Sequence, residues 1–296
     1  MRNYKDSRFR GNDTMSLLYF FAKRFIAGET LAQALPNVAA LKAQGFLTTV
    51  DHLGENVSQK SEAEKATEDY LKIIQTLKEK RLDINLSVKL TQLGLNIDQE
   101  FCLANLKQIG KYAQEVNGFI RVDAEDSSTT ASTVNIIKEV RADNLPIGGT
   151  IQTMLRRAPM DLVSFLETST KVRLCKGAYK EPLEIAYQDQ KEVKRQYIAL
   201  MKRLLTSGIY HGLATHDEEI IREAQKFAQE ATILGNDFEF QFLYGIRTKL
   251  AKQLLADGWK VRIYCPFGQA WLPYILRRLR ERKENVWFVV KNLFRN

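Results

Sequence analysis

The chain has 296 residues, 45% of them hydrophobic, which is enough apolar material for one large buried core or two small ones. Its three cysteines (Cys102, Cys175 and Cys265) are far apart and its histidines number only three, so the sequence favours neither a disulfide framework nor a metal site. The formal net charge of +9 raises the question of nucleic acid, but most basic residues alternate with acidic ones and no nucleic-acid motif accompanies them. We therefore expect a cytoplasmic protein without metal or nucleic acid, with a basic surface that suits acidic membrane lipid.

Residues 1–45 are predicted to form a tail and helices that precede the catalytic domain. Met1–Thr14 is polar and predicted to be disordered, so Met15 is an alternative start codon. Ser16–Ile26 is the most apolar segment of this region, but two basic residues interrupt it and it is too short to span a bilayer. It also lacks the cleavage site of a signal peptide, so we expect an amphipathic helix that packs on the domain.

From residue 46 to residue 296, short β-branched runs alternate with longer segments that have apolar residues at helical spacing. The predicted strands are Phe46–Val50, Ile84–Leu90, Phe119–Val122, Ile147–Ile151, Val172–Leu174, Gly212–Ala214, Phe238–Phe242 and Val261–Tyr264. Strands separated by helices run parallel with right-handed crossovers. Eight such units close into a barrel, whereas five or six would give an open sheet. The sequence thus predicts an α/β fold, a (βα)8 TIM-like barrel with extra N-terminal helices and a C-terminal helix over the barrel mouth.

Residues typical of helix ends agree with this alternation. Ser61 and Asp98 stand where helix N-caps are expected, and Gly208 and Gly258 follow apolar stripes as C-terminal stops.

Polar side chains end most of the predicted strands. They are Lys89; Asp123 and Glu125, which flank Ala124; Gln152; Arg173 and Lys176; Thr215, His216 and Asp217; and Gln241. Because barrel enzymes carry their chemistry at the C-terminal ends of the strands, we expect these side chains to lie around one site.

Two basic positions are open to more than one interpretation. Lys89 lies within an apolar strand, LSVKL, where it could pair with a carboxylate such as Asp123, act as a Schiff-base nucleophile or anchor a ligand by its charge. Arg173 and Lys176 precede Gly177, and two cations beside a small residue suit a phosphate or a reduced-flavin anion, although basic residues there are also common as plain surface. His216 alone is more typical of a hydrogen-bonded structural residue.

The last helical segment places Tyr274, Arg277, Arg278 and Glu281 on one face, at positions i, i+3, i+4 and i+7. Such a face can be plain solvated surface. The helix directly follows the last strand, however, so its first turns should lie over the mouth of the barrel. Glu281 can pair with both arginines there, and two fixed guanidinium groups suit a small carboxylate.

The chain resembles the proline dehydrogenase family, in its short stand-alone bacterial form. The resemblance covers roughly Phe46 to the C-terminus and rests on LSVKL, RVDAED, IQTMLRRA, VRLCKGAY, ATHD, FEFQFLYG, VRIYCPFG and YILRRLRE, in family order. One departure is that Glu281 is followed by Arg282, where the family often has asparagine or threonine.

The resemblance implies a β/α barrel that holds FAD over its C-terminal face. It implies that FAD is bound by Ala124, Gln152, Arg173, Lys176, Gly177, Ala178, Thr215 and His216. It implies a substrate pocket of Lys89, Tyr264, Tyr274, Arg277, Arg278 and Glu281, with Asp123 as a catalytic carboxylate, Arg173 near the flavin, and Tyr179 and Leu243 at flanking positions.

The expected activity is flavin-dependent oxidation of L-proline to 1-pyrroline-5-carboxylate, the first step of proline degradation to glutamate. The family's usual electron acceptor is membrane quinone, which implies peripheral contact with the inner face of the cell membrane. Two alternatives remain open from the sequence: a Schiff-base barrel aldolase that uses Lys89 or Lys176, and a basic lipid- or nucleic-acid-binding protein.

Overall fold

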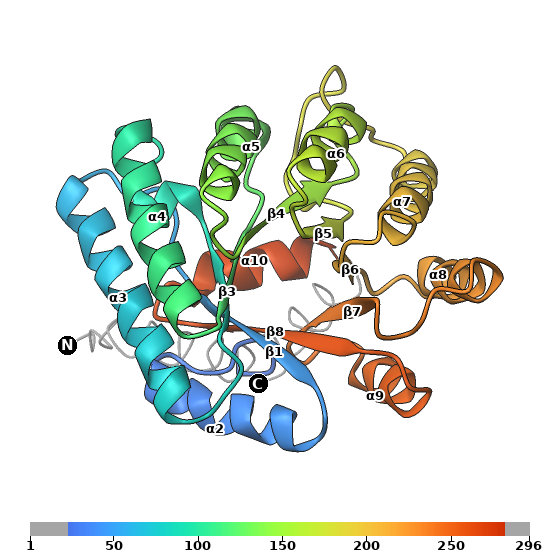
Figure 1. Ribbon diagram of the computed structural model, residues 1–296, viewed down its shortest axis with the longest axis horizontal. Coiled ribbons are helices and arrows are strands. Elements are labelled where there is room, and N and C mark those ends of the chain that lie inside the picture. Colours follow the sequence, from blue (N-terminus) through green and yellow to red (C-terminus); the bar gives the residue numbers. More distant parts are fainter. Residues whose placement is uncertain (1–22, 282–296) are drawn as a thin grey trace, which may run out of the picture.

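Eight parallel strands close into one barrel, in chain order, with β8 paired back onto β1 (Figure 1). This computed structural model describes residues 23–281, with side chains up to Arg277. The strands are β1 Leu47–His52, β2 Asn85–Val88, β3 Phe119–Val122, β4 Ile147–Gln152, β5 Val172–Cys175, β6 His211–Ala214, β7 Phe238–Leu243 and β8 Val261–Phe267. The predicted (βα)8 barrel is confirmed.

Helices surround the barrel, and one crosses its opening (Figure 1). They are α2 Leu31–Ala43, α3 Lys60–Glu79, α4 Gln99–Glu115, α5 Ser127–Ala142, α6 Ala158–Glu167, α7 Gln190–Leu205, α8 Glu218–Glu230, α9 Thr248–Ala256 and α10 Trp271–Glu281, with a short 3-10 helix, η1, at Leu90–Leu93. Helix α10 follows β8 and lies across the barrel, as predicted for the C-terminal helix. The predicted helix Ser16–Ile26 lies mostly outside the described residues, and its described end, residues 23–25, is a turn. Helix α2 contributes Ala34 and Val38 to the barrel core, and the predicted boundary between residues 45 and 46 stays a prediction.

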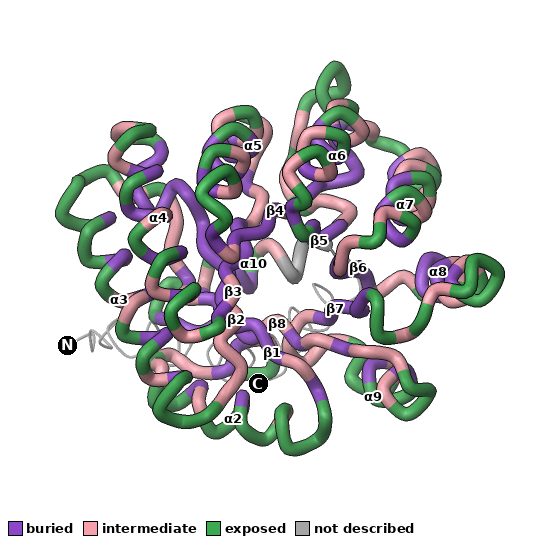
Figure 2. Tube along the Cα trace, viewed as in Figure 1, coloured by how far each residue is buried: buried purple, intermediate pink, exposed green. Residues whose placement is uncertain are grey.

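Alternation along each strand separates an outer apolar face from an inner polar one. On β2, Leu86 and Val88 are fully buried in the core between the barrel and its helices, where Tyr70 and Ile74 of α3 also pack. Between them, Ser87 points the other way and meets an arginine of β5 inside the barrel. Figure 2 shows the resulting pattern, with buried strands and helices buried only along their inner faces. The core therefore fixes the strands, and the strands fix the direction of the interior polar side chains.

Helix ends follow the predictions with one exception. The side chain of Asp98 accepts a hydrogen bond from the backbone N–H of Phe101 at the start of α4, as expected of an N-cap. Gly208 and Gly258 follow α7 and α9 with positive φ angles of 74° and 88°. Ser61 is not a cap, because α3 begins one residue earlier, at Lys60. There the Glu62 carboxylate reaches back to the N–H groups of Ser58 and Gln59, both at 3.0 Å.

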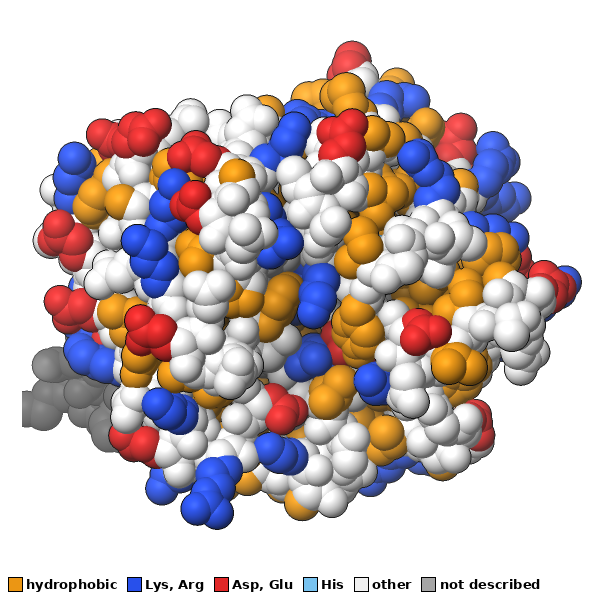
Figure 3. All heavy atoms as spheres, in the orientation of Figure 1, with side chains coloured by type: hydrophobic (Ala, Val, Ile, Leu, Met, Phe, Trp, Pro, Cys, Tyr) orange, Lys and Arg blue, Asp and Glu red, His pale blue; other side chains and the backbone are white. Residues whose placement is uncertain are grey.

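Acidic and basic side chains lie interspersed over the face of the molecule that Figure 3 shows, as the alternation of charges in the sequence predicts.

Candidate active site

The interior of the barrel holds a cluster built around Asp123, which directly follows β3. Its carboxylate accepts hydrogen bonds from Nη1 of Arg173 on β5 and from the hydroxyl of Tyr264 on β8, the latter at 2.8 Å. Arg173 also donates to Gln241 Oε1 at 2.6 Å and to Ser87 Oγ at 3.0 Å, and its guanidinium lies 5.2 Å from the centre of the Tyr264 ring. Side chains from four strands and from the residue after β3 therefore hold one another in a fixed, charge-assisted network. Asp123 and Arg173, both predicted as catalytic, are in direct contact.

Lys89 lies beside this cluster, at the end of β2, and its partner is Asp51 of β1. The ammonium is 3.5 Å from Asp51 Oδ1, and both side chains are almost completely buried. Burial alone would lower the pKa of Lys89, but Asp51 and then Asp123 outweigh it and raise that pKa. The ion pair anticipated between Lys89 and a nearby carboxylate therefore exists, with Asp51 at the shortest distance.

Arg277 of α10 is also held by a carboxylate. Its Nη1 donates to Oε1 of Glu55 at 2.6 Å, and its guanidinium lies 5.9 Å from the ring centre of Tyr179. Burial opposes the charge of Arg277, but Glu55 raises its pKa, so the guanidinium stays protonated. Burial also raises the pKa of Tyr179 to about 12, so its phenol stays neutral.

The other predicted residues of α10 are less fully defined. Tyr274 is buried in a hydrophobic cluster with Trp271 and Ile275 of the same helix and with Ile26 and Leu53. The side chains of Arg278 and Glu281 lie outside the described residues, although both positions belong to α10. The predicted support of Arg277 by Glu281 therefore stays a prediction, and the partner found for Arg277 is Glu55.

Lys176, directly after β5, lies in a second group of charges. Its ammonium is 2.7 Å from Asp217 Oδ2, and Lys194 of α7 is 3.3 Å from the same oxygen. Partial burial alone would raise the pKa of Asp217, but Lys176 and then Lys194 lower it to about 2. Two lysines thus share the Asp217 carboxylate, and their ammonium groups can supply N–H donors to a phosphate group. Lys194 also pairs with the exposed Glu219.

The remaining predicted cofactor residues lie at the ends of β4 and β6. Gln152 is buried and donates from Nε2 to the carbonyl of Glu125. Ala124, the residue before Glu125, follows β3. Thr215 is buried, and its hydroxyl accepts the N–H of Asp217 at 3.1 Å. His216 accepts the N–H of Leu243 through Nε2 at 3.1 Å, so a neutral ring carries its proton on Nδ1.

A glycine is required at position 177, between Lys176 and Ala178. Its φ angle is +110°, and a Cβ there would come within 2.5 Å of the sulfur of Met154. The backbone can therefore turn sharply immediately after β5.

These residues fit a flavin dinucleotide. Arg173 uses Nε and Nη1 in the interior network, and Nη2 makes no hydrogen bond to another described residue. Lys176 and Lys194 provide ammonium donors for a pyrophosphate, and the neutral polar groups of Gln152 and Thr215 lie at the ends of β4 and β6, the two strands that flank β5.

Three residues of the interior were missed from the sequence: Asp51, Ser87 and Glu55. The predicted first strand stopped at Val50, whereas β1 continues to His52, so the rule that strand ends carry the chemistry was not applied to Asp51. Ser87 lies in the middle of an apolar run, where only strand alternation indicates its inward direction. Glu55 lies in a loop, and the need of a buried arginine for a counter-ion is the signal that could have indicated it.

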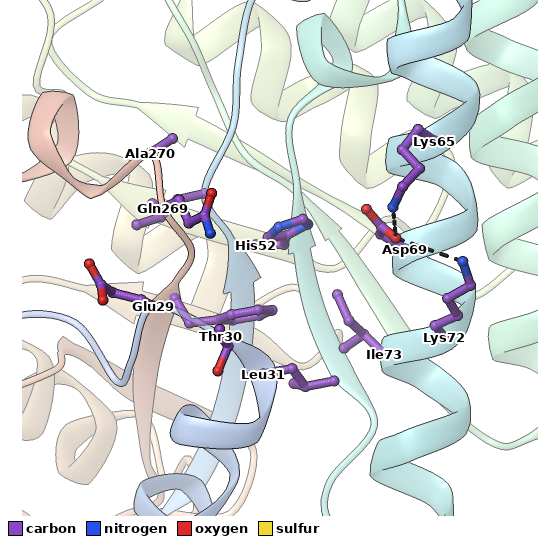
Figure 4. A pocket seen from close by; sticks show the side chains of 12 residues that line it. Glu29, Thr30, Leu31, His52, Lys65, Asp69, Lys72, Ile73, Gln269 and Ala270 are labelled. Carbon is purple, nitrogen blue, oxygen red and sulfur yellow. Dashed lines mark hydrogen bonds and ion pairs between the residues drawn. The ribbon is translucent and has the colours of Figure 1, made fainter.

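A separate open cleft of about 580 Å³ lies outside the barrel wall, between β1, α3 and the segment before α10 (Figure 4). Asp69 bridges Lys65 and Lys72 along its edge, and His52 lies at its centre. It contains none of the predicted site residues. Strand alternation explains the separation, because His52 faces outward while its neighbour Asp51 faces the interior.

Two further properties concern residues 23–281 only. In this range, no three His, Cys, Asp or Glu side chains are grouped so that they could hold a metal ion. No helix in the same range is both long and apolar enough to cross a bilayer.

Comparison with known proteins matches this geometry to one family. The family model described as proline dehydrogenase matches residues 34–291. The chain is 36% identical over 274 residues to proline dehydrogenase 1 of Bacillus subtilis (strain 168), covering 93% of this chain and 91% of that protein. It is 34% identical over 285 residues to proline dehydrogenase of Deinococcus radiodurans, covering 94% and 91%. The solved structure of proline utilization A from Bdellovibrio bacteriovorus, inactivated by N-propargylglycine, superposes with a TM-score of 0.83 at 25% identity, over 87% of this chain and 32% of that one.

Proposed function

Because this chain belongs to the proline dehydrogenase family and is of its monofunctional bacterial type, we propose a role in proline oxidation for each polar group at the barrel mouth. The enzyme is an oxidoreductase that acts on proline. In the proposed reaction, L-proline becomes 1-pyrroline-5-carboxylate: C5 loses a hydride, the nitrogen lone pair forms the C=N bond, and the nitrogen proton is released.

The proposed cofactor is FAD, which supplies the hydride acceptor when it is bound. Arg173 would lie near the flavin ring, because its network with Asp123, Gln241 and Ser87 leaves Nη2 to face a ligand. Its fixed charge favours negative charge that builds up in the transition state, an effect typically worth a few kcal/mol. Lys176, Gly177 and Ala178 would contact the phosphates, supported by Lys194. Ala124, Gln152, Thr215 and His216 complete the proposed binding set.

The proposed substrate pocket grips the proline carboxylate with cations. Arg277 and Arg278 supply forked guanidinium groups, Glu281 supports them, and Lys89 adds a buried ammonium. Glu55 already occupies one donor of Arg277, so an incoming carboxylate has to share that guanidinium with it or replace it. Tyr264 and Tyr274 would wall the ring so that C5 points toward the hydride acceptor.

Asp123 has a positioning and electrostatic role in this proposal. It receives donors from both Arg173 and Tyr264, so it fixes a cofactor residue and a substrate residue relative to each other. The amine must be neutral when the hydride leaves, since its lone pair forms the C=N bond. The carboxylate at Asp123 stabilises the positive charge that develops on that nitrogen.

The observation that carries the proposal is the direct contact of Asp123 with both Arg173 and Tyr264, next to the buried cation Lys89. The test is to purify the protein, release its chromophore by heat and identify it by mass. We expect FAD and proline-dependent reduction of an artificial electron-accepting dye. A colourless protein, or a released flavin other than FAD, would refute the cofactor assignment.

A Schiff-base aldolase is not favoured by the geometry. A nucleophilic lysine needs a lowered pKa, whereas the pKa of Lys89 is raised by Asp51 and Asp123. Lys176 is ion-paired with Asp217 at 2.7 Å.

The proposed electron acceptor is membrane quinone, reached by peripheral contact of the protein with the inner face of the cell membrane. The net charge of +9 supports attraction to acidic lipid. The test is flotation with anionic liposomes at low salt, with the flavin oxidised and reduced. Binding that weakens with salt is expected, and absence of binding in both states would favour a water-soluble acceptor.

A further inference from the structure

Asp51 is a fully buried carboxylate for whose oxygens no described residue supplies a donor at hydrogen-bond geometry. It is 0% exposed and lies on β1 in register with Ser87 of β2 and Pro266 of β8. Buried carboxylates normally accept several hydrogen bonds, because an unpaired buried charge is costly. Within the described residues, however, neither oxygen of Asp51 has a donor at hydrogen-bond geometry, and its ion-pair partner is Lys89 at 3.5 Å. Burial raises the pKa of Asp51, whereas Lys89, and after it the nearby Tyr264 hydroxyl, lower that pKa. Lys89 is therefore the main group that compensates the buried negative charge of Asp51.

The other carboxylates around Lys89 have closer partners of their own. Asp123 accepts hydrogen bonds from Arg173 and from the hydroxyl of Tyr264. The Tyr264 hydroxyl has one proton, and it donates that proton to Asp123. Glu125 accepts from the backbone N–H and the hydroxyl of Thr91. Glu55 accepts from Arg277. Of the four carboxylates whose charge acts on Lys89, only Asp51 has Lys89 as its described partner.

Lys89 in turn keeps its hydrogen-bond donors. Its ammonium makes no hydrogen bond to a described residue, and a separation of 3.5 Å from Asp51 is an ion pair rather than a tight hydrogen bond. The Lys89 ammonium thus has a counter-charge in Asp51, and its N–H groups can still donate to a ligand. This arrangement suits a second, incoming carboxylate.

We propose that Asp51 is a positioning residue for substrate binding: it keeps Lys89 charged inside the barrel, so that the ammonium can receive the carboxylate of proline. The inference rests on the proposed function, in which Lys89 belongs to the substrate pocket. In this proposal Asp51 does not touch the substrate and acts through Lys89, because it is 0% exposed and paired with that ammonium.

The substitution Asp51→Asn has a consequence whose sign can be worked out. Burial is the largest influence on Lys89 and lowers its pKa; Asp51 is the largest influence that raises it. Without Asp51, the groups that still face Lys89 are Asp123, Glu55 and Glu125, and the pKa of Lys89 falls. The variant should bind a carboxylate well at low pH, where Lys89 is still protonated. It should lose affinity as the pH rises and Lys89 becomes neutral.

The experiment measures binding of tetrahydrofuran-2-carboxylate, the ring-oxygen isostere of proline. This probe keeps the carboxylate but has no amine that titrates. Calorimetric titration of the flavin-loaded enzyme is run from about pH 6 to about pH 10 on wild type, Asp51→Asn, Lys89→Met and the double variant. Asp161→Asn is the matched control, because Asp161 is a buried aspartate paired with Arg157 on α6, outside the barrel interior.

For wild type and Asp161→Asn we expect affinities that change little over this pH range. For Asp51→Asn we expect affinity near wild type at low pH and roughly tenfold to a hundredfold weaker at high pH. Lys89→Met should be weak at every pH, and Asp51→Asn should add no pH dependence to it. In Asp51→Asn/Lys89→Arg, a guanidinium that does not titrate should remove the pH dependence.

Two results would overturn the role of Asp51. One is a flat profile for Asp51→Asn that matches wild type; the other is a pH-independent loss that also appears in the Lys89→Met background, as a purely structural role would give. Unchanged binding in Lys89→Met would instead remove Lys89 from the substrate pocket, which is a failure of the proposed function. If Asp51→Asn does not yield flavin-loaded protein, Asp51→Ser is measured in its place, since it leaves room for water where the carboxylate was.

Discussion

The guanidinium of Arg277 donates from Nη1 to Oε1 of Glu55 at 2.6 Å, which ties helix α10 to the loop after β1. Because Glu55 already holds the Arg277 side chain in place, that side chain loses little further conformational freedom when it binds a substrate carboxylate. The guanidinium must then bind both carboxylates or release Glu55. The contact also explains how a helix at the end of the chain is fixed over the barrel mouth.

The first prediction concerns this arginine. Arg277→Lys should raise the KM for proline roughly tenfold to a hundredfold, because a point charge replaces a forked pair of donors. The flavin spectrum should not change, since the flavin is bound by other residues. The measurement is proline-dependent dye reduction over a range of proline concentrations. Arg247→Lys is the matched control, because Arg247 pairs with Glu218 on the outer surface. An unchanged KM in Arg277→Lys would mean that this face of α10 does not bind substrate.

The second prediction concerns Tyr264. Tyr264→Phe removes the hydroxyl that donates to Asp123 at 2.8 Å and leaves the ring in place. A hydrogen bond to a charged group contributes about 1.5–3 kcal/mol, so kcat/KM for proline should fall at least about tenfold. Tyr112→Phe is the control, because it removes an exposed hydroxyl bonded to Gln75. Equal kinetics in the two variants would show that the Tyr264 hydroxyl is not part of the site.

The third prediction concerns Arg173. Arg173→Ala should lower flavin occupancy or shift the flavin reduction potential downward, because a positive charge near the flavin is lost. It should also destabilise the protein, since Asp123 loses its cation while still partly buried. In Arg173→Ala/Asp123→Asn, thermal stability should recover in part while the flavin defect remains. Recovery of both together would indicate a structural role alone, and an unchanged flavin content and potential in Arg173→Ala would remove it from the cofactor site.

The fourth prediction concerns pH and stability, and it involves a residue outside the site. His211 is fully buried, and its Nδ1 accepts the N–H of Val172 at 3.0 Å. Burial, and then the charges of Arg121 and Lys171, lower the pKa of His211 to about 3. In the unfolded chain the pKa is about 6.5, so the unfolded state binds a proton that the folded state does not.

A lowered folded pKa gives stability that is present above the unfolded pKa and lost as the pH falls toward the folded value. From His211 alone, the free energy of unfolding should fall by about 2 kcal/mol between neutral pH and about pH 5. His211→Asn keeps an acceptor for Val172 and should lack this part of the pH dependence. Urea unfolding of both proteins at the two pH values tests it; parallel losses in wild type and variant would contradict it.

The barrel itself was predictable because its signals are local and repeated. Eight apolar runs, each followed by a helical stripe, specify alternating strands and helices, and the bounds of β3 match the prediction at both ends. The end of β1 was missed because Asp51 and His52 are polar residues that a hydrophobic pattern assigns to a loop. They belong to the strand because β1 pairs with β8 up to His52 and Phe267, a partner more than two hundred residues away.

The same distinction applies to the site. Polar residues at strand ends, such as Asp123 and Arg173, could be identified because a barrel brings all strand ends to one face. Their pairing could not be read from the sequence, since it depends on side-chain directions across the barrel. Ion pairs such as Arg277 with Glu55 join a helix to a loop that is remote in the chain, and no local pattern specifies them.

Proline oxidation by a bound flavin is tested most directly by anaerobic titration of the purified enzyme with L-proline, in which the visible absorption spectrum of the enzyme is recorded after each addition. We expect a flavin spectrum that bleaches as proline is added, with a cyclic imine carboxylate formed in proportion to the flavin reduced. A protein that contains no flavin, or a bound flavin that stays oxidised with excess proline, would contradict it.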